Sequence, residues 1–343
     1  NGQAKSGSWS GSANYSPTRD TGAGISFGSA QSKPAQVQLD EVRVSKSIRS
    51  QGWMQTDYNN QSSPTTFVTI GTEDNNNTAP SISSLILNNG SNISLVENST
   101  VPVQWTATVT DNNGYTDIKS IEGKLDIAGV AGGKDCTVKN NNCYYVASCS
   151  VSNCSGNSCQ ATCTANVYFF ADPTDTGVPF ESQSWRSWMK VTDVTNSTNE
   201  DFSIADTTEL LTLRGVSVDG NINYGQFRPG TNSGSVNQIK KISNTGNVPI
   251  DIELNGSKLC LNFPTCTGSF IDVNNQQYSF SSFVFGNGNI LSLTPTKLNV
   301  NLTKPTQSPS NSFVNLYWGI NLPGQITTGS YLGQSLIIAV PDE

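Results

Sequence analysis

The sequence predicts an all-β protein made of tandem antiparallel β-sandwiches. Short runs of residues alternate between apolar and polar, 30 Gly and 15 Pro interrupt the 343-residue chain, and no long amphipathic helical pattern is present. Short strands separated by frequent turns are typical of sandwiches. One helical turn is expected, around residues 47–55.

The expected strands have a period of two, so one face of each strand is apolar. In residues 101–109, Val, Trp and Ala alternate with Pro, Gln and Thr. The same pattern recurs in residues 250–254, 298–302, 314–320 and 336–340. Asp251 and Glu253 fall between apolar positions and are therefore expected to face water. Leu336, Ile338 and Val340 are expected to form the apolar face of the last strand.

Two polar stretches, residues 71–80 and 192–208, are expected to be linkers. They divide the chain into segments 1–73, 80–206 and 207–343, in line with a prior of about 150 residues per domain. The last two segments have the size of single sandwiches. The first is too short to close a sandwich of its own.

Composition excludes several classes of protein. Charged residues make up 13% of the chain, the formal net charge is −7, and basic residues do not cluster, so a nucleic-acid partner is not expected. No stretch approaches the ~20 apolar residues of a membrane span. Histidine is absent, which removes His-dependent triads and imidazole acid–base chemistry.

The eight cysteines indicate an oxidising compartment. Six of them lie close together and two lie further on: Cys136, Cys143, Cys149, Cys154, Cys159 and Cys163, then Cys260 and Cys266. The gaps of three to six residues do not match paired zinc ligands, and the filler is rich in Asn and Ser. Disulfides are therefore favoured over a metal site. Only the pair Cys260–Cys266, across a turn with Pro264, is predicted from spacing, because six cysteines allow 15 pairings.

Ten Asn-X-Ser/Thr sequons are candidate glycosylation sites. They are Asn14, Asn60, Asn76, Asn89, Asn92, Asn98, Asn153, Asn196, Asn255 and Asn301. As a set they are compatible with a glycosylated extracellular surface.

Asp111, Asn113 and Asp117 are the candidate metal ligands, because a D-x-N-G-x-x-D arrangement could present oxygens to Ca²⁺. The spacing departs from an EF-hand loop, and Asx turns of this composition also form without an ion. Asp172 and Asp175 with Asp193 are a second candidate set. No other cofactor is expected.

An enzyme is not expected. Glycoside hydrolysis needs two acids about 5–10 Å apart, and the acids of residues 1–73 show no spaced pair on one strand. The tryptophans give a weaker signal for binding: Trp105 and Trp318 are expected in sandwich cores, while Trp9 could stack on a sugar or contact another subunit.

Residues 39–45 (LDEVRVS) are followed by Arg49, Trp53 and the stretch 58–61 (YNNQ). This order resembles the closing strands of concanavalin A-like (laminin G-like) jelly rolls, with residues 1–3 and 25–28 similar to the preceding strands. The resemblance implies that residues 1–73 are the C-terminal part of such a domain, which usually has more than twice this length. Either the chain is a fragment, or another chain completes an exposed edge.

Residues 80–206 resemble an immunoglobulin-like sandwich of a prokaryotic surface protein, through the strand around Trp105, the turn at 111–114 and residues 168–173. The Cys-rich stretch 136–163 would be a long insertion between its strands. Residues 207–343 resemble a further sandwich module of such surface-layer and envelope proteins. In these modules a turn like Asn244-Thr245-Gly246-Asn247 precedes a strand whose acidic side chains face outward. The resemblance implies no catalytic residues.

We therefore expect an extracellular, cell-surface structural protein that self-assembles as the subunit of a surface layer, sheath or filament. Its partners would be copies of itself and glycans. The alternative from another class is a carbohydrate-binding adhesin module, which would show selective sugar binding.

Overall fold

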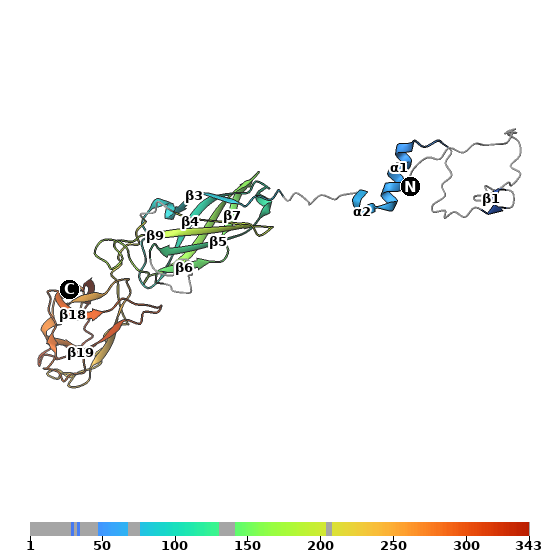
Figure 1. Cartoon of the computed structure of the whole chain (residues 1–343). Coiled ribbons are helices and arrows are strands. Elements are labelled where there is room, and N and C mark those ends of the chain that lie inside the picture. The colour runs from blue at the N-terminus through green and yellow to red at the C-terminus, as the bar shows by residue number, and fades with distance from the viewer. Residues whose placement is uncertain are drawn as a thin grey trace. The chain divides into compact units, whose positions relative to one another are not determined.

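The computed structural model describes residues 29–30, 33–34, 47–67, 76–129, 141–203 and 208–342. The chain divides into two compact units, Asn1–Asn76 and Asn77–Glu343. Antiparallel strands dominate the described residues (Figure 1), which confirms the all-β fold class. In this part of the chain no helix combines the length and the apolar character that crossing a membrane requires.

The first unit contains the strand pair β1 (Ser29–Ala30) and β2 (Lys33–Pro34) and the helices α1 (Gln51–Ser62) and α2 (Pro64–Phe67). The Ser50 side chain caps α1 by accepting a hydrogen bond from the Trp53 N–H at 3.2 Å. The helix buries none of its residues.

Helix α1 is longer than the expected turn, and it replaces the closing strands that the jelly-roll resemblance implied for Trp53 and Tyr58. The physical reason is local: the Ser50 cap and a run almost free of β-branched residues favour a helix. Residues 39–45, the rest of that resemblance, lie outside the described residues.

The first sandwich packs two four-stranded sheets face to face (Figure 1). One sheet has the order β3-β4-β8-β7, formed by β3 (Ser81–Leu87), β4 (Thr100–Thr110), β8 (Ser158–Tyr168) and β7 (Ser150–Ser155). The other has the order β10-β9-β5-β6, formed by β10 (Thr198–Phe202), β9 (Trp185–Asp193), β5 (Ile118–Ile127) and β6 (Cys143–Val146). Trp105, Trp185 and Met189 are fully buried between the sheets.

Two expectations about this sandwich need correction. The Cys-rich stretch is no insertion, because its residues from 143 onward form β6, β7 and the start of β8. The expected linker at 192–208 contains the end of β9, a tight turn and β10. The polar residues of this stretch predicted a linker, but in the β9–β10 hairpin turn they form hydrogen bonds with one another.

The second sandwich packs a five-stranded sheet against a three-stranded one. The larger sheet has the order β11-β12-β19-β16-β17: β11 (Val216–Val218), β12 (Gln238–Asn244), β19 (Phe313–Ile320), β16 (Gln276–Ser279) and β17 (Asn289–Ile290). The smaller has the order β18-β13-β20: β18 (Thr296–Leu302), β13 (Ile250–Gly256) and β20 (Ser335–Pro341). A short hairpin, β14 (Leu259–Cys260) with β15 (Phe270–Ile271), lies beside them. Short 3₁₀ turns are η1 (Asn88–Gly90), η2 (Tyr115–Asp117) and η3 (Val273–Asn275).

Two faces differ from the sequence expectation. Asp251 is fully buried: its Oδ1 accepts the N–H groups of Val300 and Asn301 at 2.9 and 3.0 Å, where the β13–β18 register shifts. In β20 the outward side chains are Leu336 and Ile338, and their neighbours pack on the core. Because nearly every residue of β20 is apolar, alternation alone could not decide which face is buried.

Candidate functional site

Disulfides staple both sandwiches. The structure joins Cys149 to Cys163, Cys154 to Cys159 and Cys260 to Cys266, with Cα–Cα distances of 4.5, 4.1 and 5.1 Å. Cys143 is also disulfide-bonded, and Cys136 lies outside the described residues. Among the described residues no cysteine is free.

The Cys149–Cys163 disulfide belongs to the core of the first sandwich. Cys163 lies opposite Trp105 on neighbouring strands, and the Cys149 N–H donates to the Ile121 carbonyl of the other sheet at 2.9 Å. A Cβ at Gly123 would lie 2.5 Å from the Trp105 ring and 2.8 Å from the Cys163 Sγ. The absence of a side chain at Gly123, on β5 of the other sheet, therefore leaves room for the Trp105 ring and the Cys163 sulfur of the facing sheet.

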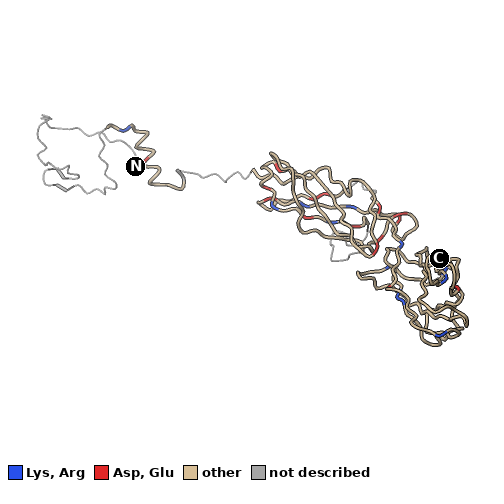
Figure 2. Tube along the Cα trace, turned by 180° about the vertical axis from the view of Figure 1, so that it is seen from behind, with Lys and Arg blue, Asp and Glu red and all other residues tan. Residues whose placement is uncertain are grey.

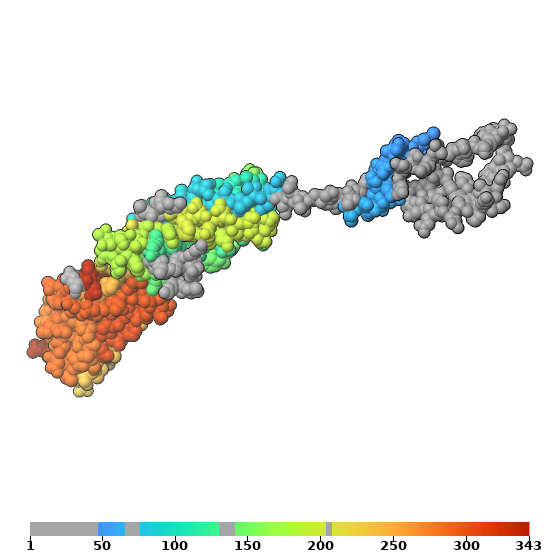
Figure 3. Space-filling view, in the orientation of Figure 1, coloured from blue at the N-terminus to red at the C-terminus, as the bar shows by residue number. Residues whose placement is uncertain are grey.

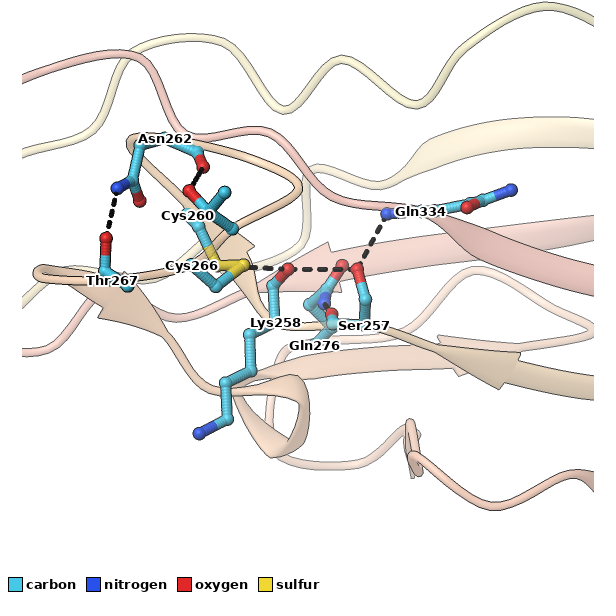
Figure 4. Close-up of a disulfide and its surroundings, with 9 residues drawn as sticks. Ser257, Lys258, Cys260, Asn262, Cys266, Thr267, Gln276 and Gln334 are labelled. Atoms are coloured by element: carbon cyan, nitrogen blue, oxygen red, sulfur yellow. Dashed lines mark hydrogen bonds between the residues drawn. A yellow bond between two sulfur atoms is a disulfide. The ribbon is translucent and has the colours of Figure 1, made fainter.

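The Cys260–Cys266 disulfide closes the turn that holds Pro264, the pairing expected from spacing (Figure 4). Asn262 Nδ2 donates to Thr267 Oγ1 inside the turn at 2.7 Å. Cys260 also exchanges two backbone hydrogen bonds with Leu332, which lies three residues before β20. The clip thus holds the segment that leads into the last strand.

Three aspartates meet at one end of the first sandwich. Asp111 follows β4, Asp117 ends η2 and Asp193 ends β9. One carboxylate oxygen from each lies within 4.8 Å of the other two. Asp111 and Asp193 are fully buried. The structure therefore groups Asp111 and Asp117, two candidates from the sequence, with Asp193, which the sequence had placed in another set.

Hydrogen bonds orient these carboxylates. Asp111 Oδ1 accepts the Asn113 N–H at 2.8 Å. Asp193 Oδ1 accepts the N–H groups of Thr195 and Ser197 at 2.9 and 2.8 Å. Asn113, the third candidate from the sequence, directs its Oδ1 to the Thr78 N–H at 3.0 Å.

The pKa values of Asp117 and Asp193 are shifted in opposite directions. Burial, together with the charges of Asp111 and Asp193, raises the pKa of Asp117. Burial opposes ionisation of Asp193 as well, but hydrogen bonds from Asn77, Thr195 and Ser197 hold its pKa below the ordinary value. Ionisation is therefore favoured at Asp193 and opposed at Asp117.

The other candidate acids, Asp172 and Asp175, have separate partners. Asp172 Oδ1 lies 2.7 Å from Lys304 Nζ of the second sandwich. Asp175 accepts hydrogen bonds from the Thr212 N–H and hydroxyl at 2.9 and 2.7 Å. Neither joins Asp193, so both belong to the connection between the sandwiches.

That connection is built around the buried turn Asn244-Thr245-Gly246-Asn247. The N–H groups of Thr245 and Asn247 donate to the carbonyls of Gly215 and Leu213, both at 2.9 Å. The Asn247 side chain accepts the Leu213 N–H at 2.7 Å and donates to the Leu211 carbonyl at 3.1 Å. The sequence indicated this turn only as a feature within the segment 207–343. In the structure it is the centre of the joint between the sandwiches.

The first sandwich contributes to the joint directly. Thr245 Oγ1 donates to Glu97 Oε2 at 2.9 Å, and the Asn98 N–H donates to the Thr245 carbonyl at 3.3 Å. Leu210 is fully buried in the first core and Leu213 packs against it. The boundary between the sandwiches therefore follows Leu213, several residues later than the expected cut at 206. In space-filling view the two sandwiches adjoin (Figure 3).

Most sequon asparagines within the described residues are exposed. These are Asn60, Asn76, Asn89, Asn92, Asn98, Asn153, Asn196 and Asn301, while Asn255 is partly buried and Asn14 lies outside the described part. Five of the exposed ones have positive φ: Asn89, Asn98, Asn153, Asn196 and Asn301. Asn153 and Asn301 lie within strands β7 and β18, and the other three lie between strands.

Charges of both signs are interspersed over the sandwiches (Figure 2). Trp105, Trp185, Trp188 and Trp318 are buried, as sandwich cores predict, whereas Trp53 on α1 is 42% exposed beneath the Arg49 guanidinium. Trp9 and most acids considered for hydrolysis lie outside the described residues.

No protein-family model matches the chain, and no curated protein matches it in sequence. Among solved structures, the dimeric latent PorU of Porphyromonas gingivalis is similar at 15% identity and a TM-score of 0.22, over 78% of this chain and 21% of that chain. A DUF4466 family protein of Parabacteroides merdae is similar at 11% identity and a TM-score of 0.20, over 71% of this chain and 99% of that chain. The alpha-2-macroglobulin of E. coli is similar at 10% identity and a TM-score of 0.17, over 75% of this chain and 17% of that chain. TM-scores this low do not establish a common fold, so these likenesses support no inference about function.

Proposed function

We propose that the protein is an extracellular structural subunit that self-assembles into a layer, sheath or filament and has no enzymatic activity. The observation that carries the proposal is the open edge at β20. This strand pairs with β13 on one side and with no described strand on the other. Its sequence is SLIIAVP, without a charge, and Leu336 and Ile338 are 46% and 40% exposed on its outer face.

Three of the other described edge strands carry features that oppose strand addition. Strand β10 has acidic residues at Glu200 and Asp201, β3 is interrupted by a register shift, and β17 has two residues. Natural sheets protect their edges in these ways, because a long apolar edge pairs with another chain. Strand β20 has seven residues, no charge and no register shift, and its one proline is the last residue, Pro341. These properties suit a strand that pairs with a second copy.

The disulfides and the joint support the structural part of the proposal. Three described disulfides fit an oxidising, extracellular compartment. They also restrict unfolding of single strands under load. The hydrogen-bonded joint between the sandwiches would pass force from one module to the next without a free linker.

The test is the assembly state of the Ile338→Lys variant, since a charge on the edge opposes pairing with a second copy. Wild-type protein should form fibres or sheets in electron micrographs as its concentration rises, and Ile338→Lys should stay monomeric with an unchanged Tm. The matched control is Ile239→Lys, which places a lysine away from β20, at a 51% exposed position of β12 that pairs with Tyr317 of β19.

Three results would contradict the proposal: a wild-type protein that remains monomeric, an Ile338→Lys variant that assembles normally, or a control that fails to assemble. A glycan array separates the adhesin alternative, because a structural subunit should bind no sugar selectively.

A further inference from the structure

We propose that Asp111, Asp117 and Asp193 form a Ca²⁺ site that clamps the two sheets of the first sandwich at one end. The three residues come from both sheets. Asp111 follows β4 of one sheet, while Asp117 directly precedes β5, and Asp193 ends β9, of the other. A cation between them would therefore hold the sheets together where the Cys149–Cys163 disulfide does not reach.

Two oxygens of the cluster are buried and have no partner. Asp111 Oδ2 and Asp117 Oδ2 have no hydrogen bond, and Asp111 is 0% exposed. Within the described part of the chain, neither residue forms an ion pair. An unsatisfied buried carboxylate oxygen is costly, because it has lost water and gained nothing. A cation in the cluster would satisfy both oxygens at once.

The separations suit calcium. Three oxygens within 4.8 Å of one another have a point no farther than about 2.8 Å from all three (4.8 Å divided by √3). Calcium binds oxygen at about 2.3–2.6 Å in flexible geometry, whereas magnesium requires about 2.0–2.1 Å in a strict octahedron. A contraction of a few tenths of an ångström therefore completes a calcium site, and a larger one is needed for magnesium.

The ligand chemistry favours a hard cation. Every donor of the cluster is a carboxylate oxygen, a set that favours hard cations over zinc or copper. Three carboxylates leave positions for water in the coordination shell of six to eight oxygens.

The carboxylates are held in place before a cation arrives. The Asn113 N–H fixes one oxygen of Asp111, and two N–H groups of the β9–β10 turn fix one oxygen of Asp193. Asn77 Nδ2 donates to Asp193 Oδ2 at 2.8 Å, so the residues that enter β3 are linked to the same cluster. Calcium would consequently order the entry to the sandwich as well as its two sheets.

The test uses the full chain, stripped with EGTA and then titrated with CaCl₂ in calorimetry. We expect one site per chain and a rise in Tm of about 3–10 °C at about 10 mM calcium, if the affinity falls in the range of extracellular sites. Magnesium at the same concentration should give a much smaller rise. Terbium should bind in competition with calcium and be sensitised by Tyr115, which is 40% exposed two residues before Asp117.

Asp117→Asn distinguishes a metal site from a purely structural cluster. Without calcium this variant should be at least as stable as wild type, because it removes repulsion and leaves no hydrogen bond broken. With calcium it should be less stable, with an affinity reduced at least about tenfold. Asp111→Asn, which keeps the acceptor for the Asn113 N–H, is the second variant if the first fails to fold. Asp126→Asn, a buried acid outside the cluster, is the control and should keep the full calcium response.

Absence of calcium binding at millimolar concentration would overturn the proposal. So would an equal calcium response in wild type and in either cluster variant. A normal response in the control together with loss in Asp117→Asn would support it. These outcomes do not depend on assembly, so the site and the proposed function can fail separately.

Discussion

The joint between the sandwiches can be tested by one added methyl group, in the variant Gly246→Ala. Gly246 is buried in the turn that docks on residues 211–215. A Cβ at this position would overlap the Leu213 carbonyl oxygen and lie 2.9 Å from the Gly215 nitrogen. Both obstacles are backbone atoms, which cannot turn aside as a flexible side chain can. The turn must therefore move away from the segment that it contacts.

The magnitude follows from the hydrogen bonds that this movement breaks. Four of them connect Thr245 and Asn247 to Leu211, Leu213 and Gly215. At about 0.5–1.5 kcal/mol net for each bond, and with water replacing part of the loss, we expect the unfolding free energy to fall by about 2–4 kcal/mol. The loss should fall on the coupling between the sandwiches, because neither core is altered.

Differential scanning calorimetry and limited proteolysis measure this effect. Wild-type protein should unfold its two sandwiches in a coupled transition and resist cleavage between residues 208 and 216. Gly246→Ala should show separated transitions and faster cleavage there. The control is Gly324→Ala in the same sandwich, where an added Cβ would meet no atom within 4 Å.

A Gly246→Ala variant with the stability and cleavage pattern of wild type would refute the reasoning. It would mean that the joint adapts at no cost, and that the sandwiches are linked less tightly than their hydrogen bonds indicate. Loss of stability in the Gly324→Ala control would show that the calorimetric change is not specific to the joint.

Two further predictions concern the first sandwich. Replacing Cys149 and Cys163 by alanine should lower the unfolding free energy by about 3 kcal/mol, as expected for a loop of this length. Removal of the less buried Cys154–Cys159 disulfide should lower it by less. Equal losses for the two disulfides in denaturant titrations would contradict this prediction. Burial raises the pKa of Asp126, although the hydrogen bond and charge of Arg186 act in the opposite direction. A raised native pKa adds stability at low pH that is lost as pH rises through the native value. The stability of wild type relative to Asp126→Asn should therefore increase from about pH 7 to about pH 4, and a decrease would show that Arg186 dominates.

The local pattern of the chain was sufficient to predict five of the strands. The alternation in residues 101–109 lies within β4, and the runs at 250–254, 298–302 and 314–320 lie within β13, β18 and β19. Alternation works because successive side chains of a strand point to opposite faces. It was ambiguous where both faces are apolar, as in β20. It failed at Asp251, a buried acid whose Oδ1 accepts two distant backbone N–H groups and whose Oδ2 lies 3.7 Å from Lys297 Nζ.

The aspartate cluster shows the limit of reasoning from spacing. Asp111 and Asp117 are six residues apart, and their loop composition singled them out. Asp193 is far from both in sequence, and it joins them because β9 pairs with β5 in register from Ile118 opposite Asp193. No local signal linked the three, because Asp193 fell in the stretch 192–208 that was expected to be a linker.

The amino-acid sequence by itself determined that this chain forms short antiparallel strands stapled by disulfides, because strand periodicity and cysteine content depend only on residues that are near in the chain. Tertiary structure decided which edge is left open, which acids meet and which turn is buried between the sandwiches. Those properties depend on the pairing of strands separated by long stretches of chain, and that pairing is set by how the two cores close.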